Sequence, residues 1–453
     1  MCRPLRGRLE FVVTLWLTTP RRSIERVFLM KKDFAFEMSG SNLRFGPGVT
    51  REVGLDLQEM SARRVLVVTD ERVAKLPPVE VVKESIDQAG ISFDLFDRVR
   101  VEPSDKSFQE AIEVATAGDY DAYVAVGGGS SIDTAKAANL YATWPADFME
   151  YVNAPLGAGK PVPGPLKPLI AVPTTAGTGS ETTGIAIFDF VERKCKTGIR
   201  HRRIRPTLGM IDPENTRTLP SLVASCAGLD VLCHALESFT AKPYTERPYP
   251  ESPNLRPAYQ GSNPISDVWS AEALRITSEN LVRVHNDPED SHARSQMILA
   301  SAYAGMGFGT AGVHLCHAMS YPISSLVHDY HPPGYPEDHA IVPHGMAVVL
   351  SAPAVFRFTA RGCPERHLTA ALHLGADVAG CAPDDAGKIL SDVVIELLQK
   401  LEMPNGFSAL GFTTSDIPAL VEGTLPQQIR HLASRVAESD ELAQLFEESM
   451  ALW

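Results

Sequence analysis

The sequence of 453 residues is poor in aromatic side chains, in positive charge and in cysteine pairs. Aromatic residues make up 7% of it, and the formal net charge of −13 argues against a protein built around a nucleic-acid-binding groove. The seven cysteines are an odd number and include no CxxC pair. These features argue against a disulfide framework and a thiolate zinc site, and they favour a reducing compartment.

A long hydrophobic run is also missing near the N-terminus. The run from Phe11 to Leu17 is interrupted by Thr14 and is far shorter than the roughly 18 residues that span a bilayer. Residues 1–32 hold eight basic and two acidic residues, whereas the remainder holds 34 basic and 53 acidic ones. This basic, acid-poor start predicts a mitochondrial transit peptide over 1–32 and a place in the matrix, with an unaddressed leader as the alternative.

Residues 33–218 alternate apolar runs with helix-like segments, which is typical of βαβ units. We expect strands at 64–69, 91–96, 122–126, 169–172 and 184–190, and helices at 79–89, 108–117 and 132–142. This region is predicted to form an α/β, doubly wound, Rossmann-like domain with a parallel sheet.

Residues 219–453 have helical periodicity and few β-branched runs, so we expect an all-α C-terminal domain. The expected helices are 221–240, 266–284, 292–306, 365–380, 385–401 and 439–451. A proline-rich insertion at 243–265 is expected to form an ordered loop. Two domains behind a leader agree with the chain length.

Two polar, glycine-rich loops follow expected strands. Residues 127–133 (GGGSSID) could present backbone N–H groups and a helix N-terminus to phosphate, although the stretch is neither GxGxxG nor a P-loop. Residues 173–181 (PTTAGTGSE) could hold a pyrophosphate, a ribose or a nicotinamide amide. The alternatives are a tight turn capped by Ser130 and a polar hairpin loop. Ligands bind at the carboxyl ends of parallel strands, and two such loops together therefore favour a dinucleotide.

Asp70 closes the expected strand at 64–69. A carboxylate there can accept hydrogen bonds from an adenosine ribose and repel a 2′-phosphate, which favours NAD over NADP. A helix cap or a solvated turn residue is the alternative.

Histidines cluster near the middle of the helical half. Six of the thirteen lie between residues 314 and 344. Upstream, Asp230 and His234 are four residues apart and would share one helix face. One carboxylate and several imidazoles suit a divalent transition metal with an open position for an oxygen ligand. A local hydrogen bond between Asp230 and His234, or a buried structural histidine, is the simpler alternative.

Four motifs in chain order carry a resemblance to a known family: GGGSSIDTAK (127–136), PTTAGTGSE (173–181), GLDVLCHALES (228–238) and HAMSYP with VPHG (317–322, 342–345). Over nearly all of residues 34–453 the chain resembles the iron-containing (group III) alcohol dehydrogenases. The resemblance implies NAD(H) and one divalent metal, Fe²⁺ or Zn²⁺.

The resemblance also implies roles for particular residues. The implied metal ligands are Asp230, His234, His317 and His344, and His314 is left as a structural neighbour. The implied cofactor residues are Asp70, Gly128, Gly129, Ser130, Asp133, Thr174, Thr175, Thr178 and Lys196.

Two departures from the family pattern stand out. Many members carry a second histidine four residues after the third ligand, His317, whereas this chain has Tyr321 there. A phenol can pass on a proton, but it is a poor general base near neutral pH. The 27 residues from His317 to His344 are also a longer spacing than expected for simple alcohol dehydrogenases. The additional residues include His328, His331 and His339, and with 243–265 they could form a lid over the substrate.

Within the family, the stretches DAYVAVGGGSSIDTAKAANLYA, RPAYQGSNPISD and AGVHLCHAMSYPIS are most similar to members that pass hydride from 4-hydroxybutyrate through tightly bound NAD(H) to 2-oxoglutarate. The products would be succinate semialdehyde and 2-hydroxyglutarate. Both substrates carry carboxylates, and Arg256 is a candidate anchor for them, with a solvated loop arginine as the alternative.

Other functions stay open at this point. The first alternative is an NAD-dependent alcohol dehydrogenase with an exchangeable cofactor. A dehydroquinate-synthase-like lyase shares the fold, and a metal-dependent hydrolase would leave the glycine loops as plain turns. In a non-enzymatic binding protein the metal ligands would be dispensable. We expect small-molecule partners, no nucleic acid and no membrane, and a homo-oligomer is compatible with the sequence.

Overall fold

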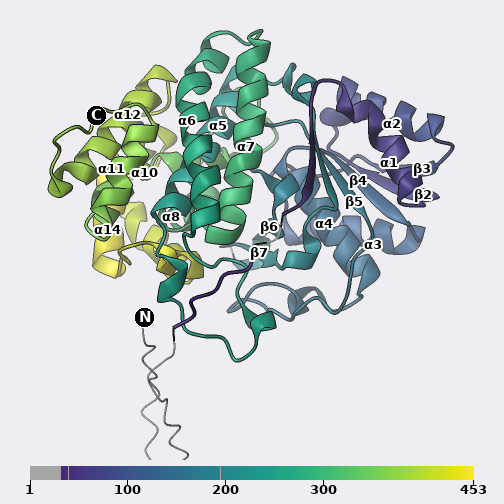
Figure 1. Cartoon of the computed structure of the whole chain (residues 1–453), viewed down its shortest axis with the longest axis horizontal. Helices are drawn as coiled ribbons and strands as arrows, with labels where there is room; N and C mark the ends of the chain where they lie inside the picture. The colour runs from purple at the N-terminus through teal and green to yellow at the C-terminus, as the bar shows by residue number, and fades with distance from the viewer. Residues whose placement is uncertain (1–31, 39, 194) are drawn as a thin grey trace, which may run out of the picture.

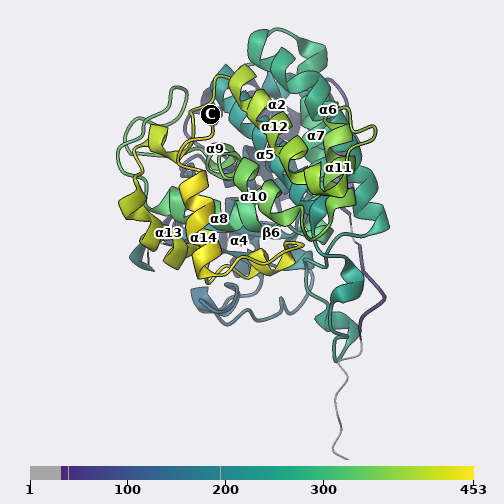
Figure 2. The same ribbon diagram turned by 90° about the vertical axis from the view of Figure 1, so that its left-hand side faces the viewer.

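The computed structural model describes residues 32–38, 40–193 and 195–453. Apart from Lys32, the transit peptide predicted over 1–32 lies outside the described residues. In Figure 1 the sheet with its covering helices lies on the right and a bundle of helices on the left. Figure 2 looks onto the helical part from its outer side.

Six parallel strands form the main sheet in the order β1-β8-β5-β4-β2-β3. The strands are β1 (Asn42–Phe45), β2 (Arg64–Val68), β3 (Ser92–Phe96), β4 (Ala122–Gly127), β5 (Leu169–Pro173) and β8 (Leu208–Ile211). The central strands are almost entirely buried, which agrees with their nearly continuous apolar sequences. The predicted doubly wound parallel sheet is therefore confirmed.

Helices cover both faces of this sheet, and each face has its own apolar core. Val65 and Val67 of β2 pack with α1 (Val53–Glu59) and α2 (Pro77–Gln88) on one face. Leu66 and Val68 pack on the other face, against α3 (Asp105–Gly118) and α4 (Gly129–Thr143). The alternation follows from the two-residue side-chain period of a strand.

The segment expected as a strand at 184–190 lies outside the main sheet. It is β6 (Ile185–Phe190), which pairs antiparallel with β7 (Cys195–Arg200) in a separate two-stranded sheet. A parallel neighbour of β5 would need a crossover of a dozen or more residues, usually a helix. Only the polar loop that includes residues 174–183 connects β5 to β6, so this segment is a strand, as expected, but it does not extend the parallel sheet.

The C-terminal part is helical. Its α-helices are α5 (Ser221–Thr240), α6 (Pro264–Asn286), α7 (Ser291–Ala311), α8 (Leu315–Ser325), α9 (His344–Val349), α10 (Ala352–Thr359), α11 (Pro364–His373), α12 (Ala386–Lys400), α13 (Ile417–Thr424) and α14 (Ser439–Glu448). The helix expected at 365–380 ends at His373, and Gly375 follows it with φ at +92°. Glycine adopts this left-handed conformation without a Cβ clash and commonly ends a helix.

Helix α5 is the central helix of this part and packs against α6, α7 and α9. Its length and mean hydropathy would allow it to cross a membrane, but 83% of its most apolar window is buried inside the protein. It also carries the buried carboxyl groups of Asp230 and Glu237. Both observations identify α5 as a core helix of the bundle.

Two glycines let the sheet part and the helical part meet closely. A Cβ on Gly305 of α7 would lie 2.2 Å from Thr182 Oγ1 and 2.8 Å from Gly179 O. Gly179 belongs to the polar loop that follows β5, and its φ is +56°. This backbone contact fixes the loop against α7 and therefore fixes its position relative to α5.

We expect Gly305→Ala to lower the free energy of unfolding by about 1–3 kcal/mol, because the added methyl group has no space at this contact. Gly309→Ala on the same helix is the matched control, since its Cβ would meet nothing closer than Thr183 Cγ2 at 3.6 Å. Helix propensity predicts that Gly309→Ala is neutral or stabilising by up to about 1 kcal/mol. Thermal and urea unfolding measure both. Equal stability of the two variants would contradict the close approach.

Candidate active site

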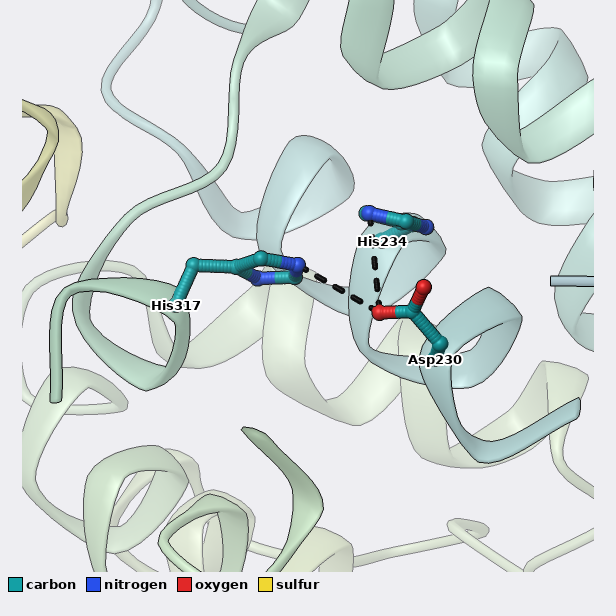
Figure 3. Close-up of side chains that lie close together, drawn as sticks. All are labelled: Asp230, His234 and His317. Atoms are coloured by element: carbon teal, nitrogen blue, oxygen red, sulfur yellow. Dashed lines mark ion pairs between the residues drawn. The ribbon is translucent and has the colours of Figure 1, made fainter. Parts of the chain in front are cut away.

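A carboxylate and three imidazoles from three helices lie close together near the loops that follow β4 and β5. Asp230 and His234 come from α5, His317 from α8 and His344 from the first position of α9. The Nε2 atoms of His234, His317 and His344 lie 3.6, 3.5 and 3.8 Å from Asp230 Oδ1. Figure 3 shows the rings of His234 and His317 directed at the Asp230 carboxylate. Thus the structure brings together all four residues that the resemblance implied as metal ligands.

The donor atoms of this group are suited to a metal ion. Ligand atoms of Asp230, His234 and His317 all lie within 4.8 Å of one another, and all three residues are buried. Asp230 Oδ1 and His317 Nε2 are buried without a hydrogen-bond partner. Leaving such atoms unpaired is costly, so a cation between them would satisfy both. One carboxylate with imidazoles is a donor set for Zn²⁺ or Fe²⁺.

Burial and nearby charges shift the pKa values of the three histidines in different directions. Burial lowers the pKa of His234 to about 3 and also lowers the pKa of His344, which keeps both imidazoles in the neutral form that binds metal. Burial acts in the same direction on His317, but the carboxylates of Glu237 and Asp230 outweigh it and raise its pKa to about 9. Although burial alone would raise the pKa of Asp230, the surrounding histidines hold it well below its usual value.

Glu237 holds His317 in position. Its Oε2 pairs with His317 Nδ1, and its Oε1 accepts hydrogen bonds from the backbone N–H groups of His314 (3.0 Å) and Cys316 (2.8 Å). A carboxylate on the far nitrogen of a ligating imidazole fixes its orientation and makes it a better ligand. Sequence reasoning missed Glu237, although it shares a helix face with Asp230 and His234 at a spacing of seven and three residues.

The other histidines of the cluster lie apart from the four candidate ligands. His314 is a buried structural residue, because its Nδ1 accepts a hydrogen bond from Leu315 N (2.7 Å) and its Nε2 contacts Thr240 Oγ1 at 3.1 Å. His328, His331 and His339 each face a nearby carboxylate outside the site.

The two glycine-rich loops lie side by side at the carboxyl ends of β4 and β5. Gly127 and Pro173 are register partners in the sheet, so the loops begin together. A Cβ on Gly129 would lie 2.7 Å from Thr178 Cγ2. Both loops line a cavity of about 350 Å³, and helix α4 begins at its wall. Seven of the implied cofactor residues line it, together with Asp230 and His344: Asp70, Gly128, Gly129, Ser130, Thr174, Thr175 and Thr178.

The other two implied cofactor residues, Asp133 and Lys196, do not line this cavity. Asp133 Oδ2 accepts a hydrogen bond from Ile187 N (2.9 Å), and its Oδ1 contacts Lys136 Nζ at 3.1 Å, so Asp133 fastens α4 to β6. Lys196 is buried, and its ammonium group pairs with Glu102 and lies 3.4 Å from Asp189 Oδ1. Burial would lower the pKa of Lys196, but these two carboxylates raise it above its usual value.

Asp70 makes the capping contacts that the sequence offered as one of its two alternative roles. Its Oδ1 accepts hydrogen bonds from the N–H groups of Arg72 and Val73, both at 3.0 Å, so it caps the short turn after β2. It also lines the cavity formed by the glycine-rich loops.

A second, smaller cavity of about 120 Å³ contains the histidine group. Lys196, Tyr321 and Tyr259 line it with the four candidate ligands, and the ring of Phe308 stacks on His234 at 4.0 Å. Gly129, Ser130 and Thr178 line both cavities, so a ligand on the glycine-rich loops would reach the histidine group.

Family models match both halves of the chain. "Iron-containing alcohol dehydrogenase" matches residues 40–213, and "Fe-containing alcohol dehydrogenase family, C-terminal" matches residues 258–450. The chain belongs to the iron-containing alcohol dehydrogenase family. It is therefore an oxidoreductase of a family that uses NAD(H) and a divalent metal.

Relatives and a solved structure agree with this assignment. The chain is 57% identical to the mitochondrial hydroxyacid-oxoacid transhydrogenase of Rattus norvegicus over 93% of its own length and 91% of that protein. It is 58% identical to the Xenopus tropicalis protein of the same name, covering 93% and 92%. The crystal structure of a 1,3-propanediol oxidoreductase superimposes with a TM-score of 0.80 at 27% identity, covering 92% of this chain and all of that one.

The structure does not bring Arg256 to the histidine group. Its guanidinium group pairs with Asp33 at 2.9 Å. Arg256 lines a neighbouring cavity of about 260 Å³ rather than the one that holds the histidines. Among the described residues of the expected lid at 243–265, only Tyr259 lines the histidine cavity.

We expect Asp230→Asn to abolish metal binding, because a neutral amide replaces the one anionic ligand, and Glu237→Gln to weaken it by roughly 10–100-fold, because the orienting carboxylate is lost. Ser238→Ala is the control on α5, since its hydroxyl contacts Ser270 Oγ at 2.7 Å on α6 and not the histidines. Elemental analysis and chelator competition measure the metal. If Glu237→Gln binds metal with wild-type affinity, the role of Glu237 is limited to accepting the backbone hydrogen bonds at the start of α8.

Proposed function

We propose that this chain is a hydroxyacid-oxoacid transhydrogenase that oxidises 4-hydroxybutyrate to succinate semialdehyde and reduces 2-oxoglutarate to 2-hydroxyglutarate. The observation that carries the proposal is the 57–58% identity to transhydrogenases over more than nine tenths of this chain. The names of these relatives and the basic composition of residues 1–32 also support a mitochondrial location.

The two half-reactions balance through the cofactor. In the first, C4 of the hydroxy acid gives a hydride to NAD⁺, and its hydroxyl group gives up a proton. In the second, NADH returns the hydride to C2 of 2-oxoglutarate, and the new alkoxide takes up a proton. No free NAD is consumed, so the same cofactor molecule can serve both steps. NAD carries the hydride, and the metal supplies Lewis-acid polarisation of the substrate oxygen.

The protein's own residues orient the reactants and handle the proton. Asp230, His234, His317 and His344 would hold the metal, and Glu237 keeps His317 aligned. Tyr321 is the hydroxyl group of this chain that we assign to proton transfer, because it lines the histidine cavity. Burial raises the pKa of Tyr321, so the phenol keeps its proton at neutral pH and suits donation in the reducing half-reaction.

Purified protein mixed with 4-hydroxybutyrate and 2-oxoglutarate, with no added NAD, is expected to form succinate semialdehyde and 2-hydroxyglutarate in equal amounts over many turnovers. Chromatography with mass detection follows both products. The alternative is an NAD-dependent alcohol dehydrogenase with an exchangeable cofactor, for which the family description is the supporting observation. Multiple turnovers with NAD alone, and none with 2-oxoglutarate alone, would favour that alternative.

A cofactor that serves both half-reactions has to remain bound, and the segment 326–343 supports such retention. We call this segment, which connects α8 to α9, the strap. Gly334, Tyr335 and Pro336 of the strap line the 350 Å³ cavity together with residues of the glycine-rich loops. Arg72, which lies two residues after Asp70, donates hydrogen bonds to the carbonyl groups of Gly334 (3.3 Å) and Tyr335 (3.1 Å). The strap therefore connects the two halves of the protein across the cofactor cavity.

The strap also fits closely against the helical half. Gly334 has φ at +85°, and a Cβ there would lie 3.2 Å from both Pro220 and Val223. The phenol of Tyr335 lies beside the thiol of Cys226 on α5. We propose that release of NAD(H) requires this segment to move and that Arg72 slows the movement.

Arg72→Ala is expected to speed NADH release about tenfold, because two hydrogen bonds to the strap are lost, and to lower the NAD content of the purified protein. Gly334→Ala, which disturbs the strap from its other side, is expected to have the same effect, and the double variant to be no faster. Displacement of bound NADH, followed by fluorescence, measures the rate. Lys75→Ala is the control, since this exposed lysine pairs with Glu71. Acceleration by Arg72→Ala but not by Gly334→Ala would mean that Arg72 binds the cofactor directly.

A further inference from the structure

The proposed substrates share a chemical feature that the site has to recognise. In 4-hydroxybutyrate the reacting carbon is separated from a carboxylate by two methylene groups. The same two methylene groups separate the keto carbon of 2-oxoglutarate from its distal carboxylate. One cationic group at a fixed distance from the metal could therefore position both donor and acceptor, which is what a shared site for two half-reactions needs.

Lys196 is the basic residue that lines the histidine cavity, but its charge is already balanced. It pairs with Glu102 and also lies beside Asp189. A substrate carboxylate near this ammonium group would meet two protein carboxylates as well. The anchor for the substrate therefore has to come from another residue.

Arg200 at the end of β7 lies next to the histidine cavity. Its guanidinium carbon lies 4.1 Å from the centroid of the Tyr259 ring, and Tyr259 lines the cavity. In the sheet register Arg200 is the partner of Ile185, which lines both this cavity and the neighbouring one of 260 Å³. Arg200 lines the neighbouring cavity itself. It is therefore situated at the boundary between the two.

The guanidinium group of Arg200 is available for a ligand. Its Nε is buried and has no hydrogen-bond partner, and within the described part of the chain no carboxylate pairs with Arg200. The neighbouring basic groups differ in this respect. Arg202 pairs with Glu37, Arg256 with Asp33 and Lys160 with Glu150.

The charge of Arg200 also reaches the reacting region. Burial raises the pKa values of Tyr259 and Tyr321, and the positive charge of Arg200 is the largest opposing influence on both phenols. Tyr321 lies within the cavity of the metal ligands. Arg200 stacks on Tyr259 and is the register partner of Ile185, and both of these residues line that cavity, so a carboxylate on Arg200 would lie at its border.

We propose that Arg200 binds the carboxylate that lies two methylene groups from the reacting carbon of both substrates. The planar guanidinium group can form two parallel hydrogen bonds with a carboxylate, and the face of Tyr259 holds it in position. Arg200 takes the role that the sequence suggested for Arg256. This inference rests on the proposed function, because it presumes substrates that carry such a carboxylate.

The test uses the donor half-reaction alone. NAD⁺-loaded enzyme is mixed with increasing concentrations of 4-hydroxybutyrate or of butan-1-ol, which has the same carbon chain without the carboxylate. Single-turnover formation of bound NADH gives an apparent dissociation constant and a limiting rate for each. We expect Arg200→Gln to weaken 4-hydroxybutyrate binding roughly 10–100-fold through the lost charged hydrogen bonds, and to leave butan-1-ol unchanged. Arg200→Lys should restore part of the binding.

Arg256→Gln is the matched control, because it removes another arginine of the same cavity whose charge Asp33 already balances. An equal loss for both substrates in Arg200→Gln would mean a structural role, and no loss for either would mean that another residue binds the carboxylate; each overturns the inference. The wild-type enzyme tests the proposed function separately. If it does not prefer 4-hydroxybutyrate to butan-1-ol, the substrate proposal fails whatever Arg200 does.

Discussion

Two carboxylates buried on one helix, Asp230 and Glu237 of α5, set the conditions for the rest of the site. Removing an ionised carboxylate from water costs several kcal/mol unless partners compensate. The compensation comes from elsewhere in the chain, through imidazoles from α8 and α9 and backbone N–H groups at the start of α8. Close packing makes this geometry rigid. A Cβ on Gly345 would lie 1.9 Å from Cys226 O, so α9 approaches α5 as closely as backbones allow and brings His344 to Asp230.

The sheet half meets this group at the carboxyl ends of its central strands. The glycine-rich loops after β4 and β5 pack against each other, and Gly179 packs against α7. The backbone geometry that suits pyrophosphate is therefore held at a fixed distance from the candidate metal ligands. Hydride transfer depends on such alignment, because the donor carbon and the nicotinamide have to be in contact while water is excluded.

The iron-containing alcohol dehydrogenase fold can serve both a dehydrogenase and a transhydrogenase, since the metal and NAD supply the same chemistry in each. What separates them is whether the cofactor leaves between turnovers and which substrates enter. In this chain we assign both properties to residues outside the histidine group. The strap beside the cofactor cavity would control cofactor release, and Arg200 beside Tyr259 would select the substrates.

Local patterns in the sequence predicted much of the fold. Buried parallel strands have nearly continuous apolar sequences, and this signal located β2, β4 and β5 to within a residue or two. The short strands β1 and β8 carry too few residues for such a signal and were not foreseen. The segment at β6 has strand composition, but composition says nothing about the partner of a strand, and its partner is the antiparallel β7.

For the site, the sequence by itself determined the kinds of ligand and their local spacing. Asp230 and His234 share a helix face because of the helical repeat, and the glycines of 127–129 are needed for close backbone approach. Only the tertiary structure decided how distant residues pair. Arg256 is a candidate anchor by sequence, but in the fold Asp33 pairs with its charge, whereas nothing in the sequence around Arg200 indicates its place beside Tyr259. Whether a charge is free or neutralised depends on residues far along the chain, and folding alone brings those residues together.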